Sequence, residues 1–208
     1  MEELSPPARF VVGLGNPDRR YQGTRHNVGF MVLRELRRRW DFGRGRSKFH
    51  GRCWTGRAAG GRVTLLAPQT YMNRSGLAVA EMMAFYRPDP SAVLIVMDDM
   101  ALPTGRLRAR ACGSPGGHKG LADILQAAGT EDLPRLRLGI GAPPEGVEAV
   151  EYVLGRFQEH ERPAILEAVE RAAGAVEDWV AKGIGYVMNH YNQNAGSISQ
   201  PEQDGKNS

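Results

Sequence analysis

An apolar strand that stops abruptly at Gly15–Pro17 restricts the fold of this chain more than any other feature. Phe10–Leu14 has the short apolar character of a strand. Pro17 prevents its continuation, because proline has no N–H for the ladder and a fixed φ. A polar loop runs on to Thr24–Asn27, and an apolar helical pattern begins directly after it. Sites in open α/β sheets lie beyond the carboxyl ends of strands, so we expect the functional site at this loop.

The rest of the chain alternates strand patterns with amphipathic helix patterns, apart from one hairpin. Such an alternation predicts a single α/β domain with a mixed, mostly parallel twisted sheet and helices on both faces. The expected strands are Arg9–Leu14, Gly51–Ala58, Arg62–Pro68, Val93–Met97, Arg106–Ala111 and Leu136–Ile140. The expected helices are Asn27–Trp40, Ser75–Tyr86, Leu121–Ala128, a short one within 145–155, and one from Pro163 to Lys182.

Local residue chemistry adds four expectations. Gly60 and Gly61 are typical of a tight hairpin turn. Ser75 is expected to cap the helix that starts there, because a serine oxygen can accept a free N–H of the first turn. The Gly/Arg-rich segment Asp41–Ser47 is expected to be irregular, and 183–192 to be a loose extension of the last helix.

Length and composition indicate one domain of ordinary size. The 208 residues are 41% hydrophobic and 24% charged, as in globular proteins. No stretch approaches the ~20 apolar residues of a membrane span, and the first residues do not resemble a signal peptide. We therefore expect a cytoplasmic protein without membrane contact. We further expect a flexible tail at 1–8, the folded domain at 9–192, and a disordered tail at 193–208.

Basic residues are concentrated in two regions, although the formal net charge is only +4. Between Arg34 and Arg62 there are ten basic and two acidic residues, and Arg106, Arg108, Arg110 and Lys119 form a second group. By contrast, Glu145–Asp178 holds nine acids and three arginines. This asymmetry favours a surface that faces a polyanion. For the run 37–39 taken alone, a solvated helix face is the preferred interpretation.

Several common site motifs do not fit. Gly13 and Gly15 follow a strand, but the third glycine of a dinucleotide-binding fingerprint is missing. The glycine-rich segment 113–120 lacks the spacing of a phosphate-binding P-loop. Ser114 lacks the flanking glycines of a nucleophile elbow. No His/Asp/Glu spacing typical of a metal site is present along the chain.

His26 and Asp98 are the strongest candidates for chemistry. His26 lies in the first strand-end loop, and Asp98 ends the buried strand pattern that starts at Val93. A carboxylate there can orient one imidazole nitrogen and leave the other to take a proton from water. Asn16 and Asn73 also follow strands and can bind substrate. A single histidine is more often structural, and a strand-end asparagine is often an ordinary turn residue.

Together these residues resemble the bacterial-type peptidyl-tRNA hydrolases, over roughly residues 9–190. Several separate motifs occur in the order found in that family. They are Val12–Pro17, Tyr21, Thr24–Gly29, Pro68–Asn73 with Ser75-Gly76, Asp98, Leu102-Pro103 with Gly105, Gly116–His118 with Gly120-Leu121, Arg135–Gly141 and Tyr152–Gly155.

The resemblance implies a monomeric α/β hydrolase that needs no metal or other cofactor and no obligate protein partner. Its substrate would be peptidyl-tRNA, bound through the acceptor stem and 3′ end and cleaved at the ester between peptide and 3′ ribose. It implies that His26 is the catalytic base, oriented by Asp98. It further implies that Asn16 and Asn73 position the substrate and that Tyr21 and Met72 form the wall of the cleft. His118 and Lys119 would lie in the gate loop (Gly113–Gly120). Tyr21, Met72, Asn73, His118 and Lys119 would thus surround the substrate, while the tRNA phosphates would be contacted by Arg108, Arg110 and Arg137.

The chain departs from the family pattern at three positions. Lys119 stands where the family usually has asparagine, Ala101 where an acid is common, and Pro115 stiffens the gate loop. The Lys119 change leaves a second hypothesis open, namely an RNA-binding protein on the same fold with weak or lost catalysis. A third hypothesis, a small-molecule hydrolase or nucleosidase, does not explain the basic regions.

Overall fold

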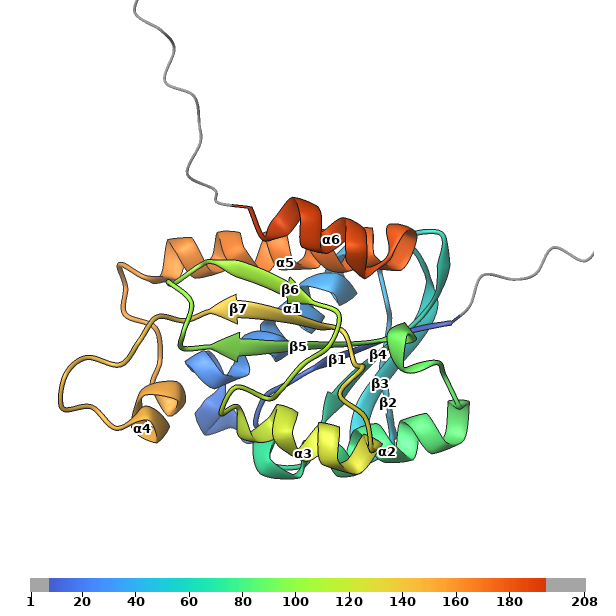
Figure 1. Ribbon diagram of the computed structural model, residues 1–208, viewed down its shortest axis with the longest axis horizontal. Coiled ribbons are helices and arrows are strands. Elements are labelled where there is room, and N and C mark those ends of the chain that lie inside the picture. Colours follow the sequence, from blue (N-terminus) through green and yellow to red (C-terminus); the bar gives the residue numbers. More distant parts are fainter. Residues whose placement is uncertain (1–7, 194–208) are drawn as a thin grey trace, which may run out of the picture.

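Seven strands form one mixed sheet in the computed structural model, which describes residues 8–193. The strands are β1 Arg9–Gly13, β2 Arg46–Lys48, β3 Gly51–Ala58, β4 Gly61–Pro68, β5 Val93–Asp99, β6 Leu107–Arg110 and β7 Arg135–Gly139. Their order across the sheet is β2-β3-β4-β1-β5-β7-β6 (Figure 1). The central pairs β4–β1, β1–β5 and β5–β7 are parallel, whereas β2–β3, β3–β4 and β6–β7 are antiparallel. The predicted mixed α/β sheet is therefore confirmed.

Helices cover both faces of this sheet, as expected. They are α1 Val28–Arg39, α2 Ser75–Tyr86, α3 Lys119–Ala128, α4 Ala149–Leu154, α5 Arg162–Lys182 and α6 Ile184–Tyr191. Short 3-10 turns precede several of them, including η2 Arg25–Asn27 and η3 Met72–Arg74. Helices α5 and α6 lie on one side of the sheet, and α2 and α3 lie on the other (Figure 1). Buried side chains of α1, α5 and α6 form one hydrophobic cluster with the sheet, and those of α2 and α3 form the other.

Successive side chains of each strand point to opposite faces of the sheet, so one strand contributes apolar residues to both clusters. Val11 of β1 belongs to the α1/α5 cluster, whereas its neighbours Phe10 and Val12 belong to the α2/α3 cluster. The same residues are almost inaccessible to water. Successive side chains of a strand point to opposite faces, so a strand covered by helices on both sides must be apolar throughout. This is why β5 reads as a continuous apolar run.

Two glycines bring the start of α1 against the end of β1. A Cβ on Gly13 would lie 2.5 Å from the carbonyl oxygen of Gly29, and a Cβ on Gly29 would lie 2.3 Å from the Leu14 nitrogen. Real Cβ atoms do not approach so closely, so any larger residue would separate the helix from the strand. The close approach places η2, which carries His26, directly above the carboxyl end of the sheet.

Some local predictions were wrong. The segment Asp41–Ser47, expected to be irregular, contains the first two residues of β2, which pairs with β3. Ser75 is the first residue of α2 rather than its cap, and its hydroxyl donates to the Met72 carbonyl at 2.8 Å. The hairpin turn is formed by Ala59 and Gly60, both with positive φ, because Ala58 already pairs with Gly61. The segment expected to be loose contains the helix α6.

The expected tails, 1–8 and 193–208, lie outside the described residues except for Ala8 and Gln193. Within 8–193, none of the helices combines the length and the apolar character needed to cross a bilayer.

Candidate active site

A cavity of about 490 Å³ opens at the carboxyl ends of β1 and β5. It is lined by the loop after β1, the turn η3, the end of β5, the gate loop and α4. Nine of the eleven predicted site residues line it: Asn16, Tyr21, His26, Met72, Asn73, Asp98, His118, Lys119 and Arg137. Arg108 and Arg110 lie instead at a smaller depression of about 180 Å³ beside β6. The fold thus brings most of the predicted site together.

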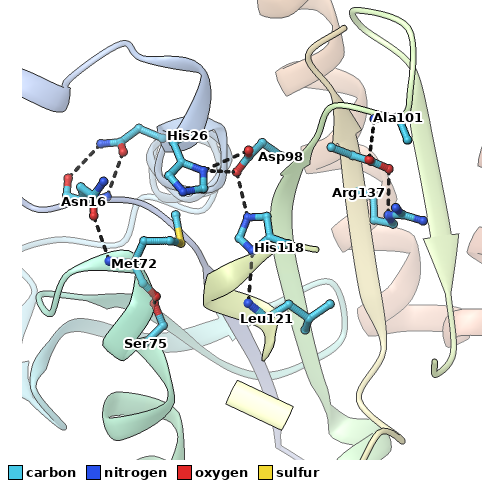
Figure 2. Close-up of polar contacts among 11 residues, drawn as sticks. Asn16, His26, Met72, Ser75, Asp98, Ala101, His118, Leu121 and Arg137 are labelled. Atoms are coloured by element: carbon cyan, nitrogen blue, oxygen red, sulfur yellow. Dashed lines mark hydrogen bonds and ion pairs between the residues drawn. The ribbon is translucent and has the colours of Figure 1, made fainter. Parts of the chain in front are cut away.

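His26 and Asp98 are hydrogen bonded. His26 Nδ1 lies 2.9 Å from Asp98 Oδ1 and 3.0 Å from Oδ2 (Figure 2). The carboxylate is ionised and can only accept, so Nδ1 carries the proton and donates it. Nε2 is then the imidazole nitrogen that is left with a free lone pair. This is the arrangement that a general base requires.

Asp98 also accepts a hydrogen bond from His118, which reasoning from the sequence missed. His118 Nε2 lies 3.1 Å from Asp98 Oδ1, and His118 Nδ1 accepts the Leu121 N–H at 3.1 Å (Figure 2). Since Nδ1 accepts, the proton of the neutral ring is on Nε2. Asp98 is buried, and burial by itself raises the pKa of its carboxyl. The electrostatic attraction and hydrogen bond of the His118 N–H, followed by those of His26, outweigh burial and hold the pKa of Asp98 well below its usual range.

The His26–Asp98–His118 group is the one set of donor atoms among the described residues with metal-like proximity, all within 4.8 Å of one another. A histidine binds a metal through a nitrogen lone pair. For His118 Nε2 to provide one, its proton would have to move to Nδ1, which faces the Leu121 N–H. The cap of α3 therefore opposes metal binding by His118. The donor set fits a hydrogen-bonded triad better than a metal centre.

Asn16 joins two loops of the site. Its side-chain Oδ1 accepts the Met72 N–H at 2.9 Å, and its backbone exchanges two hydrogen bonds with the Asn27 side chain at 2.8 and 2.9 Å (Figure 2). Asn27 is buried, and sequence reasoning assigned it no role. Its position directly after His26 was the available signal. Because Oδ1 is occupied, the amide nitrogen is the part of Asn16 left to meet a ligand. Asn73, by contrast, is exposed.

The two inner arginines of the β6–β7 edge are already engaged. Arg137 Nε lies 2.8 Å from Asp99 Oδ2, and Asp99 Oδ1 accepts the Ala101 N–H (Figure 2). Arg135 is buried and donates to the carbonyls of Gly113 and Glu131, which holds the base of the gate loop. Burial lowers the pKa of Arg135 from its ordinary value. An arginine inside an otherwise apolar strand was the sequence signal for this role.

An imidazole held by a buried carboxylate at the strand ends of an α/β sheet defines the class of hydrolytic enzymes in which histidine activates water. The family described as peptidyl-tRNA hydrolase matches residues 10–200. The chain is 45% identical over 182 residues to the peptidyl-tRNA hydrolase of Bacillus pumilus (88% of this chain, 97% of the relative), and 44% identical over 184 residues to that of Bacillus cytotoxicus (88% and 99%). It therefore belongs to the peptidyl-tRNA hydrolase family.

Comparison with solved structures leads to the same family. The crystal structure of peptidyl-tRNA hydrolase from Acinetobacter baumannii superimposes with a TM-score of 0.84 at 35% identity, covering 90% of this chain and 96% of that one. The predicted family and fold class are both confirmed.

Proposed function

We propose that this protein hydrolyses the ester between a peptide and the 3′ ribose of tRNA, with His26 as general base. The hydrogen bond of His26 Nδ1 to Asp98 carries the proposal, because it leaves Nε2 as the basic nitrogen at the cavity. Activating a water molecule is the demand that ester hydrolysis places on such a nitrogen. The family match and the relatives support the same reaction and substrate.

The reaction divides into two proton transfers. His26 Nε2 takes a proton from water as the oxygen attacks the ester carbonyl carbon, which forms a tetrahedral oxyanion. Amide N–H groups of Asn16 and Asn73 are the donors we assign to that oxyanion and to the substrate. When the intermediate collapses, the bond to the ribose oxygen breaks, and His26 returns the proton to it. Asp98 stabilises the imidazolium between the two steps.

The tRNA is held by charge rather than by base recognition. Arg108 and Arg110 are exposed on β6, so their guanidinium groups are available to phosphates of the acceptor stem and 3′ end. Phosphate contacts position a nucleic acid without reading its sequence, which suits an enzyme acting on many tRNAs. Met72 and Tyr21 form cavity walls, while His118 and Lys119 belong to the gate loop. We further propose that the protein acts as a cytoplasmic monomer without a cofactor.

The test is hydrolysis of N-acetyl-aminoacyl-tRNA by the purified chain, with and without EDTA. We expect EDTA-resistant cleavage that falls by roughly 10²- to 10⁴-fold in His26→Ala, the usual contribution of a general base. Binding of tRNA by that variant should stay unchanged. His160→Ala, which removes an exposed histidine, is the matched control and should be fully active. Binding of tRNA by the wild-type chain without cleavage would contradict the proposal and support the RNA-binding hypothesis.

A further inference from the structure

Helix α4 forms one wall of the cavity although it stands apart from the two helical layers (Figure 1). Ala149, Val150 and Val153 line the cavity, and Val150 is 55% exposed. The element that α4 packs against most is η2, the turn that contains His26. Val153 is the one buried residue of this six-residue helix, so the contacts made by its flanking residues also bear on its position.

Arg25, the residue before His26, provides those contacts. Its backbone N–H donates to the Gly155 carbonyl at 3.0 Å, and its Nη1 donates to the Arg156 carbonyl at 2.7 Å. Its Nη2 forms an ion pair of 2.7 Å with Glu161 Oε2, which also accepts the Gln158 N–H. The Arg25 and Glu161 side chains are only 6% and 13% exposed. One buried side chain thus ties η2 to the segment between α4 and α5.

Two aromatic rings complete this attachment. The Arg25 guanidinium carbon lies 4.3 Å from the ring centre of Tyr152 and 5.2 Å from that of Phe157. Tyr152 belongs to α4, and its hydroxyl donates to the Ile140 carbonyl, just beyond β7, at 2.7 Å. A planar guanidinium can stack on rings while its N–H groups bind carbonyls, which a lysine cannot reproduce.

We propose that Arg25 is a positioning residue for substrate binding, which holds α4 as a cavity wall through Glu161 and Tyr152. This inference rests on the proposed function. His26 is oriented separately by Asp98 of β5, and none of the contacts described above links Arg25 to that carboxylate. Loss of the Arg25–Glu161 pair therefore loosens the wall and leaves the base in place. The expected effect is on KM rather than on kcat.

Glu161→Gln is the most direct test, because it removes the charge and keeps the size and an acceptor oxygen. We expect KM for N-acetyl-aminoacyl-tRNA to rise roughly 3- to 30-fold, with kcat and its pH profile unchanged. Hydrogen exchange at the amides of α4 should become faster. Glu177→Gln is the matched control within α5, the helix that begins directly after Glu161, since Glu177 pairs with Arg39 at 3.1 Å away from α4. It should change neither KM nor the exchange of α4.

Arg25→Lys distinguishes the positioning of α4 from a general contribution of Arg25 to the stability of the fold. It retains a charge for Glu161 but loses the stacking and the fork of donors, so its KM should lie between those of the wild type and Arg25→Met. An unchanged KM in folded Glu161→Gln overturns the proposal. A fall in kcat with a shifted pH profile overturns it too, because Arg25 would then act through His26. If the wild type cleaves nothing, the proposed function fails, and exchange of α4 still decides whether Glu161 holds the helix.

Discussion

Asp98 receives hydrogen bonds from two histidines that come from different parts of the chain. His26 precedes α1, and His118 caps α3 at the end of the gate loop. Both imidazoles approach the same oxygen, at 2.9 and 3.1 Å. The carboxylate therefore orients His26, the proposed base, and anchors the gate loop at once, so a change in the loop reaches His26 through one shared atom.

Lys119 stands where the family resemblance leads us to expect asparagine, and it is exposed at the rim of the cavity. We expect Lys119→Asn to hydrolyse substrate at the wild-type rate or faster, by at most roughly tenfold, the worth of one hydrogen bond. A short amide places a donor with less loss of side-chain entropy than a long flexible cation. The measurement is kcat/KM on N-acetyl-aminoacyl-tRNA.

Lys119→Met is the control for that experiment, because it removes the charge without adding an amide. A gain in Lys119→Asn but not in Lys119→Met would assign the effect to the amide. A large loss in both would show that the ammonium group has its own function in this chain.

At the scale of elements, the β6–β7 edge carries four arginines, two held by contacts within the protein and two exposed to solvent. The register pairs Arg108 with Arg137 and Arg110 with Arg135, and such cross-strand partners lie on the same face. The two on β7 are engaged, Arg137 by Asp99 and Arg135 by loop carbonyls, while the two on β6 are exposed. The arginines of β7 are thus held by contacts within the protein, whereas those of β6 are exposed to solvent.

We predict that Arg110→Ala raises KM and reduces the salt dependence of tRNA binding by about one unit of log–log slope, the loss of one phosphate contact. The slope is measured from binding isotherms at several salt concentrations. Arg87→Ala, which removes an exposed arginine at the end of α2 and outside both basic groups, is the control. If the two variants have the same slope as the wild type, Arg110 does not contact phosphate.

At the scale of the whole molecule, strand order assembles the site. β1 and β5 are adjacent and parallel, so the loops that follow them open at the same edge. His26 and Asp98 are 72 positions apart in the chain yet 2.9 Å apart in space. The antiparallel edge strand β6 then returns the chain to α3 through the gate loop, which brings His118 over the same carboxylate.

The stability of the protein towards acid also depends on contacts made in the folded molecule. Hydrogen bonds from Arg38, then Arg39, lower the pKa of Glu35 from 4.5 to about 2. A carboxyl whose pKa is lowered by folding contributes stability above its unfolded pKa, and this contribution disappears as the pH falls from 4.5 towards 2. We expect Glu35→Gln to flatten the dependence of Tm on pH across that interval.

Thermal unfolding between pH 2 and pH 7 measures this dependence. Glu145→Gln removes the same charge from an exposed loop position and should leave the curve parallel to that of the wild type. A Glu35→Gln curve that also stays parallel would show that folding does not lower the pKa of Glu35.

Element identity could be read from the sequence wherever the local pattern was sufficient. The apolar run of β5, the C-terminal end of α2 and the class of the sheet follow from periodicity and from helix and strand signals. The strand β2 could not be predicted, because its three exposed residues are a strand only through pairing with β3. Helix α6 depends likewise on tertiary contacts, among them the Tyr191 hydroxyl bonded to Asp178.

The sequence by itself determined which residues we propose for the chemistry: a histidine in the first strand-end loop and an aspartate at the end of a buried strand. Only the tertiary structure decided how they are used. Three features depend on distances between segments that are remote in sequence. Asp98 accepts hydrogen bonds from two histidines, the cap of α3 sets the tautomer of His118, and Arg25 joins η2 to α4. No local pattern encodes such distances, because they result from the packing of the complete sheet and its helices.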